Sequence, residues 1–111
     1  MVRRNPKLYL QDILISIEAI EEYTRDLTET NFYRNGQVQD AVIRRLEIIG
    51  EAVKSLEEEF RQRYPNLPWK NMAGMRDVLI HQYFGVDLRR VWLTIKRDLP
   101  AIKREISEIQ E

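Results

Sequence analysis

The 111-residue sequence contains no cysteine, which excludes disulfide bonds, thiol chemistry and zinc-finger sites. Its 18 basic and 18 acidic side chains leave a formal net charge of zero, which argues against a general nucleic-acid binder. No apolar run approaches the roughly 20 residues needed to cross a bilayer, and no signal-peptide pattern opens the chain. With 43% hydrophobic and 32% charged residues, the composition is typical of one globular helical domain over residues 1–111, and we expect it in the cytoplasm.

The charges are unevenly distributed along the chain. Residues 12–60 hold five basic and twelve acidic side chains, whereas residues 61–104 hold ten basic and three acidic ones. Such a split can focus a positive field on one part of the surface, and phosphate is the common target of such a field. Alternatively, the acidic half folds back on the basic half and the charges form ordinary helix salt bridges. Charge alone leaves both interpretations open.

Two stretches carry apolar residues at intervals of three and four, which predicts amphipathic helices over residues 8–27 and 37–63. Asn5-Pro6 is a suitable start for the first helix, because proline is tolerated in the first turn. The stretch from Thr28 to Gly36 interrupts the pattern and contains the turn signal Asn35-Gly36.

A proline-containing break after the second helix predicts further, shorter elements. We expect residues 69–74 to form a short helical turn, followed by a helix over about 75–84 that Gly85 ends. Asp87 is the expected N-cap of a last helix, in which Pro100 introduces a kink. The sequence therefore predicts an all-α, up-and-down bundle of four to five helices, with Trp69 and Trp92 assigned to packing.

One polar helix face collects side chains that can do chemistry. His81 is the only histidine, and a lone histidine is more often packed than catalytic. Here Asp77 lies one helical turn before it and can orient the imidazole. Arg76 and Tyr83, seven residues apart, lie nearly in register on the adjacent strip. We therefore expect these four residues to form a site.

Arginine and histidine together suit cleavage of a phosphodiester by the neighbouring ribose 2′-hydroxyl. Histidine can move a proton near neutral pH, and a guanidinium can hold the phosphate and stabilise the negative charge of the pentavalent state. The sequence shows no HxxE, DxD or HxH ligand set, so we expect no metal and no cofactor.

The helix geometry limits what one chain can do. Arg76 and His81 lie about 140° apart around an ideal helix and roughly 7 Å apart along it. One chain also offers only one histidine, whereas such cleavage usually benefits from both an acid and a base. A two-fold dimer that brings two copies of this helix together would solve both problems.

The residues Arg76, His81 and Tyr83, in the pattern Arg-x4-His-x-Tyr, resemble the signature of the HepT-like branch of the HEPN superfamily. The resemblance extends over nearly the whole chain. It includes Asp12-Ile13-Leu14 and the segments 41–52, 68–77 and 91–100. Arg-x4-His alone is a weak signal, whereas the combined run is specific.

The resemblance implies a helical-bundle toxin of a toxin–antitoxin pair, acting as a metal-independent endoribonuclease on RNA. Arg76 and His81 carry over as the catalytic pair of a homodimer, and Asp77 stands where the family has a polar residue. The implied partner is a minimal nucleotidyltransferase antitoxin that transfers AMP from ATP to Tyr83. The alternative is a non-catalytic dimeric module that serves as partner or substrate of a nucleotidyltransferase. The motif alone does not separate the two.

Overall fold

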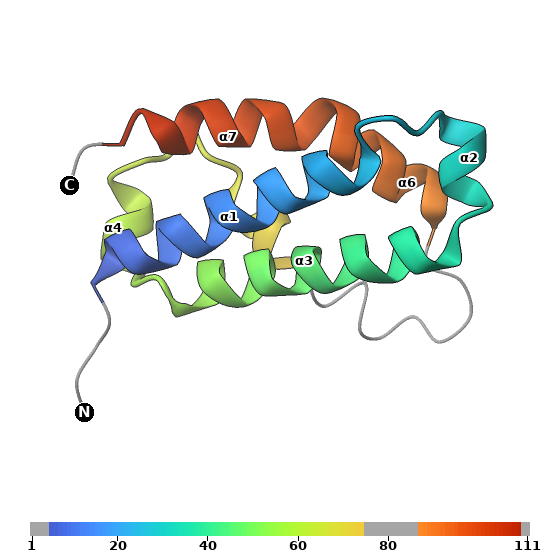
Figure 1. The fold of residues 1–111 in the computed structure, drawn as a ribbon. Helices are drawn as coiled ribbons and strands as arrows, with labels where there is room; N and C mark the ends of the chain where they lie inside the picture. Colours follow the sequence, from blue (N-terminus) through green and yellow to red (C-terminus); the bar gives the residue numbers. More distant parts are fainter. Residues whose placement is uncertain (1–4, 75–86, 110–111) are drawn as a thin grey trace.

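The computed structural model describes residues 5–74 and 87–109, and every secondary-structure element in these two stretches is a helix (Figure 1). The expected all-α bundle is confirmed. The elements are α1 (Pro6–Thr24), α2 (Glu29–Tyr33), α3 (Gly36–Ser55), α4 (Glu58–Gln62), helical turns at 69–74, α6 (Leu88–Leu93), η1 (Thr94–Asp98) and α7 (Leu99–Ser107).

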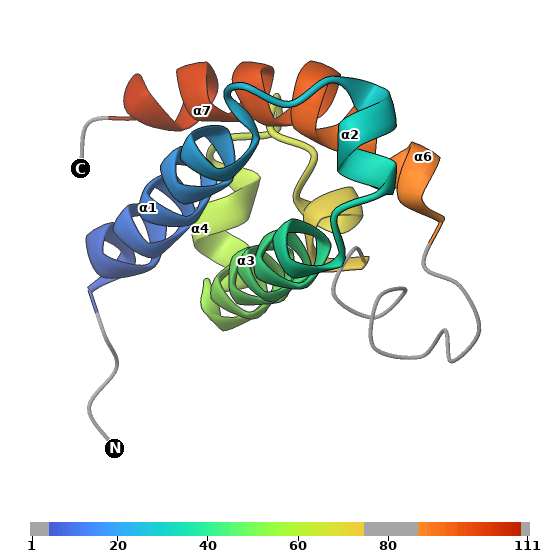
Figure 2. The same ribbon diagram turned by 45° about the vertical axis from the view of Figure 1, so that its right-hand side comes forward.

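The three long elements define the bundle. Helices α1 and α3 pack side by side in opposite directions, and α7 packs against α1 (Figure 1). Figure 2, in which α1 and α3 are seen closer to end-on, shows the α6–η1–α7 segment running across the other side of the bundle. Short α2 joins α1 to α3 and contacts α6. The start of the last helical segment is thereby packed against the turn between the first two long helices.

Helix α1 begins where the sequence predicts. The Asn5 side chain accepts a hydrogen bond from the backbone N–H of Lys7 (2.9 Å), and Pro6 occupies the first helical turn. The helix ends at Thr24 and not at residue 27. There the hydroxyl of Thr24 donates to the carbonyl of Ile20, and the N–H of Leu27 closes a turn onto the carbonyl of Thr24.

The stretch between the first two long helices holds a short helix that the sequence analysis missed. The hydroxyl of Thr28 accepts from the backbone N–H of Asn31 (3.1 Å), and Glu29 favours the positive end of the helix dipole. Phe32, within this helix, is completely buried. Five residues are too few to show a hydrophobic period. The capping residue Thr28 was therefore the sequence feature that could have predicted this helix.

The prediction of one continuous helix over residues 37–63 is wrong. Helix α3 ends at Ser55, Leu56 is extended, and α4 starts at Glu58. The apolar spacing cannot reveal this break, because Val53, Leu56 and Phe60 keep intervals of three and four and all are buried. The acidic run 57–59 was the available signal, since carboxylates favour a helix N-terminus.

The last helical segment passes Pro100 through a π-helical turn. Pro100 has no N–H, so the carbonyl four residues earlier would lose its partner in a regular α-helix. In η1 the N–H of Leu99 donates to the carbonyl of Thr94, five residues back, and the chain stays helical from Leu88 to Ser107. The kink expected at the proline therefore takes the form of a widened turn before it.

One apolar cluster lies between these helices, and both tryptophans belong to it, as expected. Among the described residues, no helix is both long and apolar enough to cross a membrane. The buried apolar residues are Leu10, Ile13, Ile17, Ile20, Phe32, Val42, Leu46, Ile49, Ala52, Val53, Leu56, Phe60, Leu67, Trp69, Met72, Val91, Trp92, Ile95, Leu99, Ile102 and Ile106.

Candidate functional site

The predicted site residues Arg76, Asp77, His81 and Tyr83 all lie outside the described residues, as do the helix expected over 75–84 and its stop at Gly85. What the structure describes is the frame on either side of them. Residues 69–74 lead into segment 75–86, and α6 follows it.

The N-terminal side of the frame is held by Trp69 and Met72. The indole N–H of Trp69 donates to the backbone carbonyls of Arg61 (3.0 Å) and Tyr64 (2.9 Å), so the ring ties these helical turns to the end of α4. Met72 is fully buried, and its N–H donates to the carbonyl of Pro68 (3.0 Å). The carbonyls of Arg61 and Tyr64 also accept backbone N–H groups, from Tyr64 and Leu67, so the indole adds a second hydrogen bond to each carbonyl.

The C-terminal side is held by the start of α6. As predicted, Asp87 is the N-cap, and its carboxylate accepts from the backbone N–H of Arg90 (3.2 Å). One turn later Trp92 packs on Phe32 of α2, with ring centroids 5.4 Å apart. The ammonium of Lys96 covers the ring of Trp92 at 4.7 Å from its centroid. Phe32 could not be predicted as the partner of Trp92, because it lies in the short helix α2, which has no hydrophobic period.

Helix α2 also contributes a polar side chain to this end. Tyr33 donates a hydrogen bond to the carboxylate of Glu29 (2.7 Å), and this bond is the main cause of the raised pKa of Tyr33. Arg89 lowers that pKa and Asp87 raises it, so both charges act on Tyr33 from α6. The hydroxyl therefore stays protonated at neutral pH beside the start of α6.

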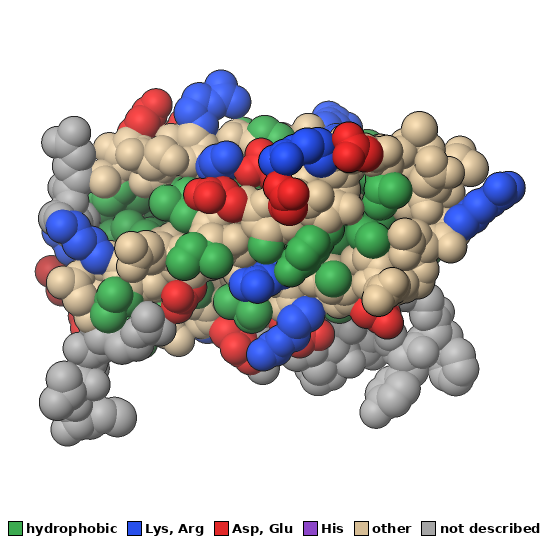
Figure 3. All heavy atoms as spheres, viewed as in Figure 1, with side chains coloured by type: hydrophobic (Ala, Val, Ile, Leu, Met, Phe, Trp, Pro, Cys, Tyr) green, Lys and Arg blue, Asp and Glu red, His purple; other side chains and the backbone are tan. Residues whose placement is uncertain are grey.

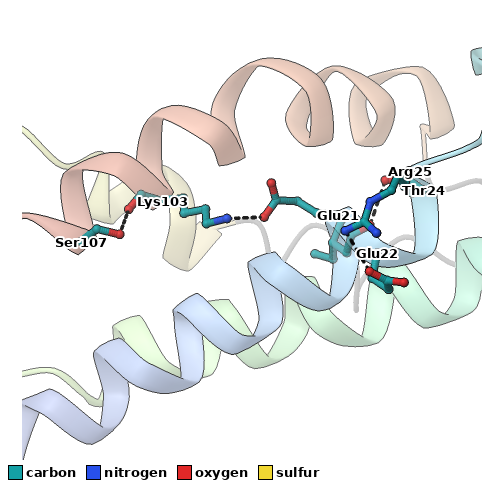
Figure 4. A network of polar contacts seen from close by, with 7 residues as sticks. Glu21, Glu22, Thr24, Arg25, Lys103 and Ser107 are labelled. Carbon is teal, nitrogen blue, oxygen red and sulfur yellow. Dashed lines mark hydrogen bonds and ion pairs between the residues drawn. The ribbon is translucent and has the colours of Figure 1, made fainter.

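Basic side chains outnumber acidic ones on both sides of segment 75–86. Residues 61–74 carry three basic side chains and no acidic one, and residues 87–98 carry four basic and two acidic ones. The opposing interpretation of the charge split also finds support, because Lys103 of α7 pairs with Glu21 of α1 (2.9 Å) and so joins the two halves of the chain (Figure 4). Within residues 5–74 and 87–109 no group of three or more His, Asp or Glu side chains is placed to hold a metal ion.

The family model described as "Ribonuclease HepT-like" matches residues 13–109. A Methanocaldococcus jannaschii protein named "Gamma-glutamylcyclotransferase and putative RNase" is 56% identical over 110 residues, which are 99% of this chain and 50% of that relative. The chain thus spans half the length of this relative.

Two further relatives match over nearly their whole length. A Thermococcus cleftensis protein named "Probable ribonuclease HepT" is 46% identical over 110 residues, covering 99% of this chain and 100% of the relative. A Caldanaerobacter subterraneus protein named "Putative RNase" is 42% identical over 106 residues, covering 96% and 95% of the two chains. No solved structure matches significantly.

The cap at Asp87 yields a test of the frame. We expect Asp87→Ala to lower the free energy of unfolding by about 1 kcal/mol, because α6 loses a side-chain acceptor for its first turn. Asp87→Asn is the matched control, since asparagine caps as well as aspartate while removing the charge. Urea denaturation followed by circular dichroism measures both. Equal losses in the two variants would assign the effect to the charge and not to the cap.

Proposed function

Because this chain belongs to the ribonuclease HepT-like family, we propose that it is a metal-independent endoribonuclease and the toxin of a type II toxin–antitoxin pair. The observation that carries the proposal is similarity along 99% of the chain to a relative of the same length named a ribonuclease. Its substrate is RNA, and it acts in the cytoplasm.

The proposed chemistry uses the two residues of the Arg-x4-His motif. A ribose 2′-oxygen attacks the adjacent phosphorus, the bond to the 5′-oxygen breaks, and a 2′,3′-cyclic phosphate and a 5′-hydroxyl result. The imidazole of His81 takes the proton from the 2′-hydroxyl or supplies one to the leaving 5′-oxygen. The guanidinium of Arg76 stabilises the charge on the phosphoryl oxygens, and Asp77 orients the imidazole.

A homodimer completes this site in the proposal. Each chain has one histidine, whereas the reaction uses both an acid and a base. Two-fold symmetry would place the two motifs opposite each other, so that one subunit supplies the base and its partner the acid. The positive charge on both sides of segment 75–86 supports RNA as the substrate, because it attracts the phosphate backbone.

In this proposal the activity is regulated by modification of Tyr83. A partner nucleotidyltransferase, the antitoxin, catalyses attack of the tyrosine oxygen on the α-phosphorus of ATP, and pyrophosphate leaves. The resulting phosphodiester adds negative charge and bulk two positions from His81. Like charge and steric exclusion would then both keep RNA out.

The first test of this function is substitution of the catalytic pair. We expect Arg76→Ala and His81→Ala each to reduce RNA cleavage by about 10²–10⁴-fold, because each removes a proton carrier or a charge-stabilising donor. Cleavage of a labelled RNA in EDTA provides the measurement, and unchanged circular dichroism is the control. Wild-type rates in both variants would refute the assignment. An inactive wild-type chain would favour the non-catalytic binding module.

The second test concerns the shared site. We expect mixed Arg76→Ala and His81→Ala chains to regain part of the cleavage that each variant has lost, since a heterodimer can contain one intact Arg–His pair if each site draws on both subunits. The measurement is cleavage after co-refolding, with each variant alone as the control. A strictly monomeric protein at micromolar concentration in light scattering would contradict the dimer.

The third test concerns Tyr83. We expect Tyr83→Phe to cleave RNA and stop growth like wild type, but to escape neutralisation by the co-expressed nucleotidyltransferase, because it lacks the acceptor oxygen. Intact-mass and peptide spectrometry on the wild-type chain should place AMP on Tyr83. Tyr33→Phe is the matched control and should remain subject to neutralisation. An adduct on another residue, or full neutralisation of Tyr83→Phe, would place control elsewhere.

A further inference from the structure

Three pairs of adjacent basic residues recur every seven residues along α6–η1–α7. The residue before each pair, Leu88, Ile95 or Ile102, packs into the core, and the last two are only 4% exposed. The pairs therefore keep one position relative to the core, even though η1 lies between them. They are Arg89-Arg90, Lys96-Arg97 and Lys103-Arg104.

The first member of each pair faces a neighbour in the fold. Lys103 hydrogen-bonds Glu21 of α1, which raises the pKa of Lys103 (Figure 4). Lys96 lies over the ring of Trp92, and Arg89 acts on Tyr33 of α2. Lys103 and Lys96 therefore already have local electrostatic partners.

The second members form an arginine row made up of Arg90, Arg97 and Arg104. Two positions after a core residue, a helical side chain points roughly away from the core, and all three are exposed. Among the described residues, the ion pairs involve Arg25, Arg44 and Lys103, and none involves the row. Figure 3 shows basic side chains projecting from the edge of the molecule along which α7 runs. Within residues 5–74 and 87–109 the row therefore has no ion-pair partner.

Charge and spacing indicate which class of partner fits the row. Residues 88–107 hold six basic and two acidic side chains, Asp98 and Glu105, so the surface stays positive. Neighbouring arginines of the row are about 10 Å apart along the helix, so the row spans roughly 20 Å. A guanidinium binds phosphate through two parallel hydrogen bonds. Regularly spaced guanidinium groups fit a regularly spaced polyanion.

The row also begins next to the predicted catalytic segment. Arg90 lies nine residues after His81, and the cap at Asp87 fixes the turn of α6 that carries it. The row therefore follows the motif closely along the chain. Building on the proposed ribonuclease function, we propose that Arg90, Arg97 and Arg104 bind phosphates of the RNA strand outside the cleavage site.

The test compares two triple variants with the same change in net charge. One replaces Arg90, Arg97 and Arg104 by glutamine. The control replaces Lys7, Arg44 and Lys54, exposed cations of α1 and α3, by glutamine. Glutamine keeps a helix propensity close to those of arginine and lysine, so both should fold, as circular dichroism will verify. Both are made in the His81→Ala background, so that a labelled single-stranded RNA is bound and not cut.

Affinity is measured by fluorescence anisotropy over a range of NaCl concentrations in EDTA. Each phosphate contact on single-stranded RNA adds about 0.7 to the slope of log affinity against log salt. Loss of three contacts should lower that slope by about 2 and weaken binding roughly a hundredfold near 0.1 M salt. The control triple should bind like its parent. Equal weakening in both triples, or none in the row variant, overturns the proposal.

A kinetic arm separates this proposal from the proposed function. With His81 intact, the row variant should raise KM and leave kcat near wild type, because contacts remote from the scissile bond bind substrate and transition state equally. A lowered kcat with unchanged KM overturns the row as a binding surface.

If the wild-type chain does not cleave RNA, the ribonuclease function fails, whereas the affinity measurement still decides whether the row binds RNA. Loss of nucleotidyltransferase binding with intact RNA affinity would assign the row to a protein partner and overturn the proposal.

Discussion

Helix α1 buries one face between α3 and α7, and this shared burial holds the long elements of the bundle together. Ile13, Ile17 and Ile20 on that face are completely excluded from solvent. Full burial of such a side chain stabilises the fold by about 1.5–3 kcal/mol. The ion pair between Lys103 and Glu21 also joins α1 to α7, but both side chains are more than a third exposed, so screening by water leaves it a minor term. Apolar packing sets the helix positions, and the ion pair follows from them.

The short helices α2 and α4 hold the two parts of the chain that flank the predicted catalytic segment. Helix α2 is too short to be stable alone, yet it brings Phe32 under Trp92 and thereby fixes α6. Helix α4 and the turn after it similarly present the carbonyls of Arg61 and Tyr64 to the indole of Trp69, which fixes the turns at 69–74. Each tryptophan thus combines a buried ring with a polar or cationic contact at its edge or face. The two ends of segment 75–86 are held by different parts of one core.

The charge asymmetry of the sequence is resolved by helix faces. A basic residue directly after a core position lies at the flank of the last helical segment, where Lys103 meets an acidic side chain of α1. A basic residue one position further on points away from the core and stays exposed, as Arg97 and Arg104 do. The charge split therefore contains a pair that joins the two halves of the chain, Lys103 with Glu21, and basic residues that stay exposed. A neutral chain can in this way present a locally positive surface.

The sequence by itself determined the features that depend on local chemistry. Asn5 and Asp87 were identifiable as caps because the acceptor and its N–H lie within three residues, and the stripe in α1 followed from period alone. The motif from Arg76 to Tyr83 stays a prediction from sequence, since it lies outside the described residues. Only the tertiary structure showed where the helical spacing of apolar residues continues although the backbone is no longer a regular α-helix. Val53, Leu56 and Phe60 keep helical spacing although Leu56 is extended, and η1 keeps Ile95 and Ile102 buried across a widened turn. Spacing records which side chains are buried, whereas only contacts between distant segments decide where the backbone turns.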